Sequence, residues 1–203
     1  MRFLLTHSLL SSWLYAMKSS PYEDATSEKD AISDFLQVLR REPTEVTQAM
    51  RNGNEFEDLV TKIATGDDVD TDHKWYAAAS KAAGKISGSS VQYKAKKDIC
   101  VAGLDILLYG RLDFLKAGEI VDTKFSQTYD RGKYIDSTQH PVYMELIPEA
   151  EKFTYLVSDG TNVWTETYRR DETKPIVPII SDFLAWLTNN GYMDLYKQYW
   201  VAL

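Results

Sequence analysis

The feature that most restricts the fold is the region from residue 90 to residue 125, where apolar and polar side chains alternate. A period of two residues is typical of β-strands with one buried face. The pattern predicts four strands, paired as an antiparallel meander, at residues 91–97, 99–109, 111–115 and 119–125. Asp113, Asp122 and Lys124 fall inside this region. Charged side chains are rarely buried unless they are paired or bind a metal, so these three need a physical reason.

The segments on either side of this region are predicted to be mainly helical. Apolar residues recur with helical spacing at about 5–16, 27–41, 54–64 and 73–85, and a short helix is expected at 44–51, closed by Asn52-Gly53. Residues 66–72 are acidic and are interpreted as an exposed loop. After the meander we expect a helix at 139–150 and two strands, at 153–157 and 163–168, joined at Asp159-Gly160.

This order of elements predicts an α/β fold in which a mixed β-sheet is flanked by helices. We expect one domain over residues 1–203. It has a helical part to about residue 88, the sheet and one helix over about 89–170, and a C-terminal helix over about 176–203. That last helix carries the apolar residues Phe183, Trp186, Leu187 and, past Gly191, Leu195 and Tyr199.

Composition and the N-terminal segment bear on the cellular location. One cysteine among 203 residues excludes an intramolecular disulfide, a thiolate zinc site and a four-cysteine iron–sulfur cluster, and it fits a reducing, cytoplasmic compartment. The first sixteen residues superficially resemble a secretory signal, but polar residues at 6–8 and 11–12 interrupt the apolar run. We interpret them as an amphipathic helix of the mature protein. No segment is long enough to span a membrane.

The net charge of −7 argues against a non-specific nucleic-acid binder. An acidic protein can still contact DNA, provided that it carries a local basic patch. The candidates for such contacts are Lys94, Lys96, Lys97, Arg111, Arg131 and Lys133. The alternative interpretation is that these residues are the solvated edges of a strand and a loop.

The spacing of the two aspartates and the lysine suggests a metal site. Side chains alternate across a strand, so Asp122 and Lys124 project from the same face. If Ala117-Gly118 forms a two-residue hairpin loop, Asp113 lies directly opposite Asp122. Like charges across a sheet are destabilising, and a Mg²⁺ or Mn²⁺ ion between them would reverse the sign. The alternative is a surface acid near the turn and an exposed ion pair.

Two helical segments offer further groups for such a site. In the helix at 54–64, periodicity places Glu55 and Glu57 on opposite shoulders of the buried stripe and cannot choose between them. In the helix that begins near Thr138, which suits an N-cap, Gln139 and Tyr143 are four residues apart and share a face. An amide and a phenol on one face can position a lysine, a water or a phosphate. Ordinary amphipathic helices would show the same patterns.

Taken together, these motifs resemble the PD-(D/E)XK nuclease superfamily, specifically its RecB-like and lambda-exonuclease-like phage branch. The residues from 8 to 13 are similar to the opening helix of RecB-type domains, and the resemblance extends from about residue 5 to residue 170. The matching motifs occur in the family's order: Gly53-x-x-Phe56-Glu57, Gly110-Arg111-x-Asp113, Val121-Asp122-x-Lys124 and Gln139-x-x-x-Tyr143.

The resemblance implies a restriction-endonuclease-like core and a role for each motif residue. It selects Glu57 over Glu55 and implies that Glu57, Asp113 and Asp122 bind Mg²⁺ or Mn²⁺, with the Val121 carbonyl as a further backbone ligand. Lys124 would orient the attacking water and favour its deprotonation. Gln139 and Tyr143 would support Lys124 and the scissile phosphate. The implied reaction is hydrolysis of a DNA phosphodiester bond, leaving a 5′-phosphate.

Three functions remain as alternatives at this point. The first is a phage-type exonuclease that resects DNA ends for recombination in the host cytoplasm, with a single-strand annealing protein as a further candidate partner. The second is a structure-specific endonuclease. The third is a DNA- or protein-binding module whose nuclease site is vestigial, which the acidic charge would suit. Ring-forming trimers occur among such exonucleases, which makes a homo-oligomer an option, although no residue pattern indicates one.

Overall fold

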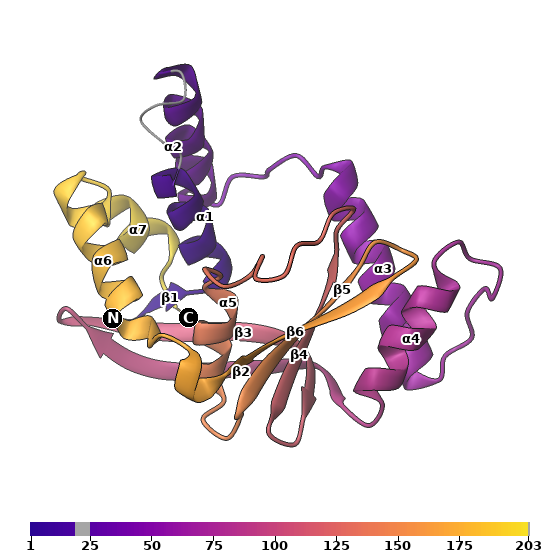
Figure 1. Ribbon diagram of the computed structural model, residues 1–203. Helices are drawn as coiled ribbons and strands as arrows, with labels where there is room; N and C mark the ends of the chain where they lie inside the picture. The colour runs from indigo at the N-terminus through magenta and orange to yellow at the C-terminus, as the bar shows by residue number, and fades with distance from the viewer. Residues whose placement is uncertain (19–24, 203) are drawn as a thin grey trace.

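The computed structural model describes residues 1–18 and 25–202 and shows an α/β fold, in which helices flank a mixed six-stranded sheet (Figure 1). The strands are β1 (Phe3–Leu5), β2 (Ser90–Val101), β3 (Leu104–Lys116), β4 (Glu119–Phe125), β5 (Lys152–Ser158) and β6 (Val163–Arg169). The helices are α1 (His7–Lys18), α2 (Ala25–Leu39), α3 (Gln48–Thr65), α4 (Tyr76–Ile86), α5 (Gln139–Leu146), α6 (Ile176–Asn189) and α7 (Met193–Tyr199), with a 3₁₀ turn η1 (Arg170–Glu172) after β6.

The long strand β3 determines how the sheet is arranged. The antiparallel strand β2 pairs along nearly the whole of one edge of β3. The opposite edge is shared: β1 pairs with residues 106–108 in parallel, and β4 pairs with residues 114–116 in the antiparallel sense. Residues 109–113 therefore have no strand partner on this edge within the described chain. Beyond β4 the sheet continues through β5, which is parallel to β4, and antiparallel β6.

The helices form two groups, each with its own apolar cluster against the sheet (Figure 1). The larger cluster joins α1, α2, α5, α6 and α7 to the sheet and includes the fully buried rings of Phe35, Phe153 and Phe183. The smaller cluster joins α3 and α4 to the sheet, with Phe56 packed close to Phe125. The two groups leave the unpaired part of β3 between them.

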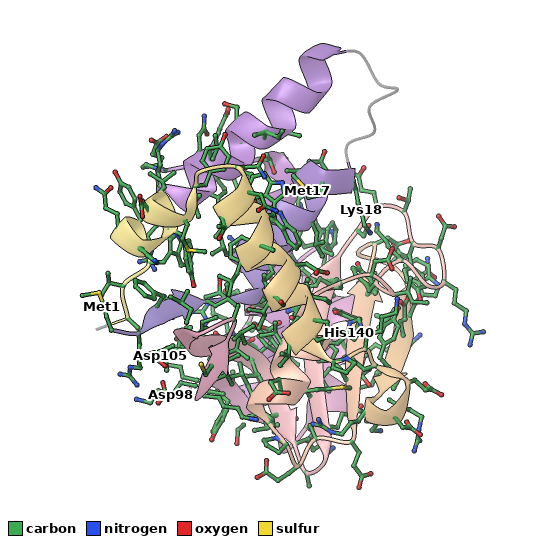
Figure 2. The ribbon with its side chains drawn as sticks, turned by 90° about the vertical axis from the view of Figure 1, so that its left-hand side faces the viewer. Met1, Met17, Lys18, Asp98, Asp105 and His140 are labelled. Carbon is green, nitrogen blue, oxygen red and sulfur yellow. The ribbon has the colours of Figure 1, made fainter. Side chains whose placement is uncertain are left out.

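The N-terminal segment differs from the predicted single helix because its first residues form strand β1. Leu5 is fully buried in this strand, and the helical stripe begins with Leu9. The C-terminal residues lie beside β1, where the amide of Leu4 donates to the Trp200 carbonyl at 2.6 Å. Figure 2 shows Met1 near the surface residues Asp98 and Asp105 of the β2–β3 hairpin, whereas His140 lies in the interior.

The predicted four-strand meander is wrong in its first half, where two long strands replace three short ones. Asp98 and Gly110 do not interrupt the strands; the turn is at Ala102-Gly103, so that Val101 pairs with Leu104. Both turn residues have positive φ, 51° and 75°, as a two-residue type I′ hairpin requires. The predicted second hairpin is confirmed, because Lys116 pairs with Glu119 across Ala117-Gly118.

Three helix predictions also need correction. The short helix predicted at 44–51 and the helix at 54–64 are one helix, α3, because Thr47 caps its start and Gly53 is tolerated inside it. Helix α5 ends at Leu146 instead of residue 150, since Pro148 disfavours helical geometry in the residue before it. The predicted C-terminal helix is divided at Gly191, and Tyr196 is buried in place of Leu195 and Tyr199. Among the described residues, no helix combines the length and apolarity needed to cross a membrane.

Gly110 allows α5 to approach β3 closely. A Cβ atom at this position would lie 2.6 Å from Cε1 of Tyr143 and 2.8 Å from Cδ1 of Leu146. These distances are shorter than real Cβ contacts, so a side chain at this position would force Tyr143 and Leu146 of α5 to move. The glycine of the Gly110-Arg111-x-Asp113 motif is therefore explained by packing.

We expect Gly110→Ala to lower the free energy of unfolding by about 1–3 kcal/mol, the usual cost of overpacking a core. A matched control is Gly53→Ala in α3, where an added Cβ meets no atom within 4 Å. That change should stabilise the protein by about 0.5–1 kcal/mol, because alanine is the better helix former. Urea denaturation measures both. A Gly110→Ala variant as stable as wild type would show that α5 does not need this contact.

Candidate active site

An open pocket lies at the unpaired edge of β3. Its lining residues come from five places: the start of α1, helix α3, residues 109–111 and 113 of β3, strand β4 and helix α5. The sequence-predicted residues Glu57, Asp113, Asp122, Lys124, Arg111, Gln139 and Tyr143 all line it. Segments that are far apart in the sequence are thus brought together by the sheet.

The two aspartates lie where β3 and β4 stop pairing. The backbone ladder ends at Phe114 and Val121, one residue short of Asp113 and Asp122. In place of a further strand pair, Oδ2 of Asp113 accepts a hydrogen bond from the Thr123 amide at 3.3 Å. Asp122 is 2% exposed, and its Oδ1 accepts a short hydrogen bond from the Gln139 side-chain amide. The expected juxtaposition of the aspartates is present.

Burial and mutual repulsion shift two acids of the pocket, Asp113 and Glu57, toward their protonated forms. Burial raises the pKa of Asp113 well above its ordinary value, and the nearby carboxylates of Asp122 and Glu57 raise it further, while Lys124 opposes them. The pKa of Glu57 is raised by burial and by Asp122. Lys124 and the exposed Arg111 are the cations that line the pocket beside these three acids.

Lys124 is the cation at the centre of this group. Its Nζ lies 2.7 Å from Oδ2 of Asp122, and about a third of its side chain is exposed. Burial acts to lower the pKa of Lys124, but the charges of Asp122, Asp113 and Glu57 outweigh it and the pKa is raised. The amine consequently stays protonated at neutral pH and acts as a positive charge and hydrogen-bond donor.

Helix α5 fixes one side of the pocket through Gln139 and Tyr143. The Tyr143 hydroxyl donates to the Arg111 carbonyl at 3.0 Å, so it holds the backbone of β3 next to Asp113. The expectation that Thr138 is a side-chain N-cap is wrong, since its hydroxyl donates instead to the His7 carbonyl of α1 at 3.1 Å. This bond connects the starts of α5 and α1 at the pocket.

The structure places Glu57, and not Glu55, at the pocket. The Glu57 carboxylate accepts a hydrogen bond from the Gln92 amide at 2.9 Å. Glu55 lies elsewhere on α3, with its carboxylate 3.0 Å from Nε2 of His73. The choice that periodicity left open is thus made by the direction in which α3 presents its two shoulders to the sheet.

The oxygen donors suit a hard divalent cation, although they are not arranged as a finished site. Among the described residues, no three His, Cys, Asp or Glu side chains form a group that could hold a metal as they stand. Oδ2 of Asp122 is buried, and its polar partner within the described chain is the Lys124 amine at 2.7 Å. Carboxylate oxygens are the ligands that Mg²⁺ and Mn²⁺ prefer.

The remaining predicted residues lie outside the pocket. The Val121 side chain is buried in the smaller apolar cluster, and Val121 is not a lining residue. Of the six candidates for DNA contact, Arg111 alone lines the pocket. Lys97 is paired with Glu145 at 2.6 Å, and Lys133 donates to Ser126 and to the Thr128 carbonyl. Lys94, Lys96 and Arg131 are exposed.

Two residues at the site were not predicted as site residues. His7 lines the pocket with its ring edge against Tyr143, at 5.3 Å between centroids, and burial and Lys124 lower its pKa to about 4. The imidazole is therefore neutral at pH 7. Gln92 contacts Glu57 from the interior of β2. A polar residue in an alternating strand gives no indication of such a contact. In the sequence His7 is noticeable only because it interrupts an apolar run.

Comparisons with known proteins add information on the fold. No family model matches the sequence, and neither does any curated protein. Among solved structures, the chain is similar to the crystal structure of SSO0001, with a TM-score of 0.52 and 15% sequence identity. The similarity covers 94% of this chain and 77% of that one. At this identity the likeness shows a shared fold and nothing about activity.

The raised pKa of Asp113 predicts that this carboxylate destabilises the metal-free protein. A carboxyl group with a raised folded-state pKa gives stability that is complete below its unfolded pKa and is lost as the pH rises through the folded value. Asp113→Asn should therefore stabilise the protein in EDTA by at least about 1 kcal/mol at pH 8 and by less at pH 5. Urea denaturation at the two pH values measures this difference.

The matched control for that experiment is Asp105→Asn, at the exposed start of the same strand (Figure 2). A surface substitution of this kind should change stability by no more than about 0.5 kcal/mol at either pH. An Asp113→Asn variant that is less stable than wild type at pH 8 would contradict the raised pKa of Asp113.

Proposed function

We propose that this protein is a Mg²⁺- or Mn²⁺-dependent deoxyribonuclease with a PD-(D/E)XK-type core, acting as an exonuclease on DNA ends. The observation that carries the proposal is the pocket at the unpaired edge of β3. It gathers Glu57, Asp113, Asp122 and Lys124, which the motif resemblance selects, and burial with mutual repulsion raises the pKa of Asp113 and Glu57. A bound cation would favour the charged forms of these acids and offset the cost of burying them together.

Asp113 and Asp122 are the residues that would hold the metal, and Glu57 faces the same pocket from α3. When bound, the metal would supply hydroxide near neutral pH and stabilise the negative charge that develops on the phosphate. Gln139 restrains Oδ1 of Asp122, and Lys124 holds the other oxygen of this carboxylate by an ion pair at 2.7 Å. This restraint would reduce the reorganisation needed on binding.

Lys124 and Arg111 provide the positive groups for a phosphodiester substrate. Lys124 stays protonated, so it would donate to the attacking water or to a phosphate oxygen and stabilise developing charge. Arg111 is exposed and lines the pocket beside Asp113, where its guanidinium can contact phosphate oxygens. Tyr143 holds the Arg111 backbone and would act through position.

The preference for DNA ends rests on the resemblance to phage exonucleases. It brings with it a single-strand annealing protein as a candidate partner, a homo-oligomer as a candidate assembly and the cytoplasm as the location. An endonuclease would use the same pocket, because the residues around the scissile bond do not require an end.

The proposal predicts that purified protein with Mg²⁺ or Mn²⁺ degrades linear DNA and that EDTA stops the reaction. The assay compares blunt, tailed, single-stranded and covalently closed circular DNA. Cleavage of closed circles would identify an endonuclease instead. If every substrate stays intact with either metal, the nuclease proposal is wrong.

Variants test the assigned residues in the same assay. Asp122→Asn and Lys124→Ala should each lower the rate by at least about 100-fold, the usual loss when an electrostatic group at a reacting centre is removed. Lys116→Ala, at the exposed hairpin end of β3, is the matched control and should leave the rate unchanged. Circular dichroism checks that each variant is folded.

A further inference from the structure

Gln92 has a backbone conformation that is rare for its residue type and position. Its φ is 52°, in the left-handed region, although it lies inside β2. Among the described residues, two other non-glycine residues have positive φ: Arg41, after α2, and Ala102, in the β2–β3 turn. Such strained residues persist only where the surrounding structure enforces them, and they cluster at functional sites.

The strain at Gln92 coincides with a break in the sheet next to Asp113. Val91 pairs with Phe114 and Tyr93 pairs with Leu112, so continuous pairing would place Gln92 opposite Asp113. That one pair is missing from an otherwise regular run of pairs. At the same position the side chains of β3 change cluster: Leu112 packs in the larger cluster, whereas Phe114 packs in the smaller one.

The departure from the ladder directs the Gln92 side chain to α3. Its Nε2 donates to Oε1 of Glu57 at 2.9 Å, and both side chains line a shallow pocket beside Arg111 that adjoins the main one. Within the described chain, this is the one hydrogen bond to the Glu57 carboxylate. Asp122 repels that carboxylate, so without a donor the flexible glutamate would turn toward solvent.

A neutral amide is suited to this position for a physical reason. An arginine or lysine would hold Glu57 equally well but would cancel its charge. Glutamine restrains the carboxylate and leaves the negative charge available to a cation. A side chain that hydrogen-bonds to a metal ligand usually fixes the orientation of that ligand.

We propose that Gln92 is a positioning residue, whose strained backbone holds the Glu57 carboxylate at the pocket in the orientation that binds a divalent cation. The inference rests on the proposed function, because it assigns Glu57 to the metal. It adds a residue from β2, a strand that none of the four motifs includes.

The test measures Mn²⁺ binding to the whole protein by electron paramagnetic resonance, without DNA. Gln92→Gly keeps the left-handed backbone accessible and removes the amide. We expect its Mn²⁺ affinity to fall by about 10–100-fold, with a changed spectrum of the bound ion, while its melting temperature in EDTA is not lowered. If the glycine variant does not fold, Gln92→Asn replaces it in the test. Asparagine also tolerates positive φ but is one methylene shorter, so this variant should lose Mn²⁺ affinity to the same extent.

The matched control is Ala102→Gly, which relieves the same backbone strain in the β2–β3 turn without touching the pocket. It should bind Mn²⁺ as wild type does. The partner variant is Glu57→Gln. If Gln92 acts through Glu57, the double variant Gln92→Gly/Glu57→Gln should bind Mn²⁺ no more weakly than Glu57→Gln alone.

The outcomes separate the inference from the proposed function. Wild-type protein that neither binds Mn²⁺ nor cleaves DNA overturns both. Wild-type protein that binds Mn²⁺, together with a folded Gln92→Gly variant that binds it equally well, overturns the positioning role alone. A loss of affinity that is just as large in the Glu57→Gln background would also overturn it, because Gln92 would then act independently.

Discussion

Strand β3 has one edge that neither β1 nor β4 covers over residues 109–113, and the arrangement of the site depends on this opening. A strand paired with this edge would have used its backbone hydrogen-bonding groups and filled the space. Side chains take its place: the Tyr143 hydroxyl bonds the Arg111 carbonyl, and the Asp113 carboxylate bonds the Thr123 amide. The sheet therefore creates a polar pocket between two apolar clusters, each of which packs a different group of helices.

The same opening explains why the charges are costly and why they persist. Charged groups in a closed core would have to be neutralised, whereas an open pocket can hold them although they lower the free energy of unfolding. Lys124 offsets part of the repulsion among the three acids, yet the pKa values of Asp113 and Glu57 stay raised. A ligand that carries positive charge would offset the remaining repulsion, which supports the proposed metal site.

The sequence was sufficient to predict the α/β class, the β3–β4 hairpin register and the gathering of the motif residues. Period-two alternation and turn chemistry act locally, so the fold class and the hairpin register can be inferred from neighbouring residues. The gathering of the motif residues was instead implied by the family resemblance. The opening in the sheet could not be predicted, because it depends on β1, a three-residue strand with no alternating pattern, pairing with a segment a hundred residues away. The role of Gln92 was hidden for a similar reason: its strained φ is imposed by tertiary packing.

A second buried carboxylate shows that burial alone does not decide whether the pKa of a carboxyl group is raised. Glu166 on β6 is 7% exposed, yet it accepts hydrogen bonds from the hydroxyls of Tyr129 and Tyr168 and from the amides of Gly132 and Tyr134. Burial acts to raise its pKa, but these donors outweigh burial and the pKa is lowered. The glutamate thus remains charged.

Three of the donors to Glu166 belong to the segment between β4 and α5, so Glu166 anchors that connection to the sheet and sets where α5 begins. Glu166 is a structural charge, fully satisfied by the protein. Asp113 has one amide donor at 3.3 Å and two anionic neighbours, and its pKa moves in the opposite direction. The protein can therefore stabilise the charged form of a buried carboxylate where the fold requires it, whereas in the pocket the pKa of Asp113 is raised.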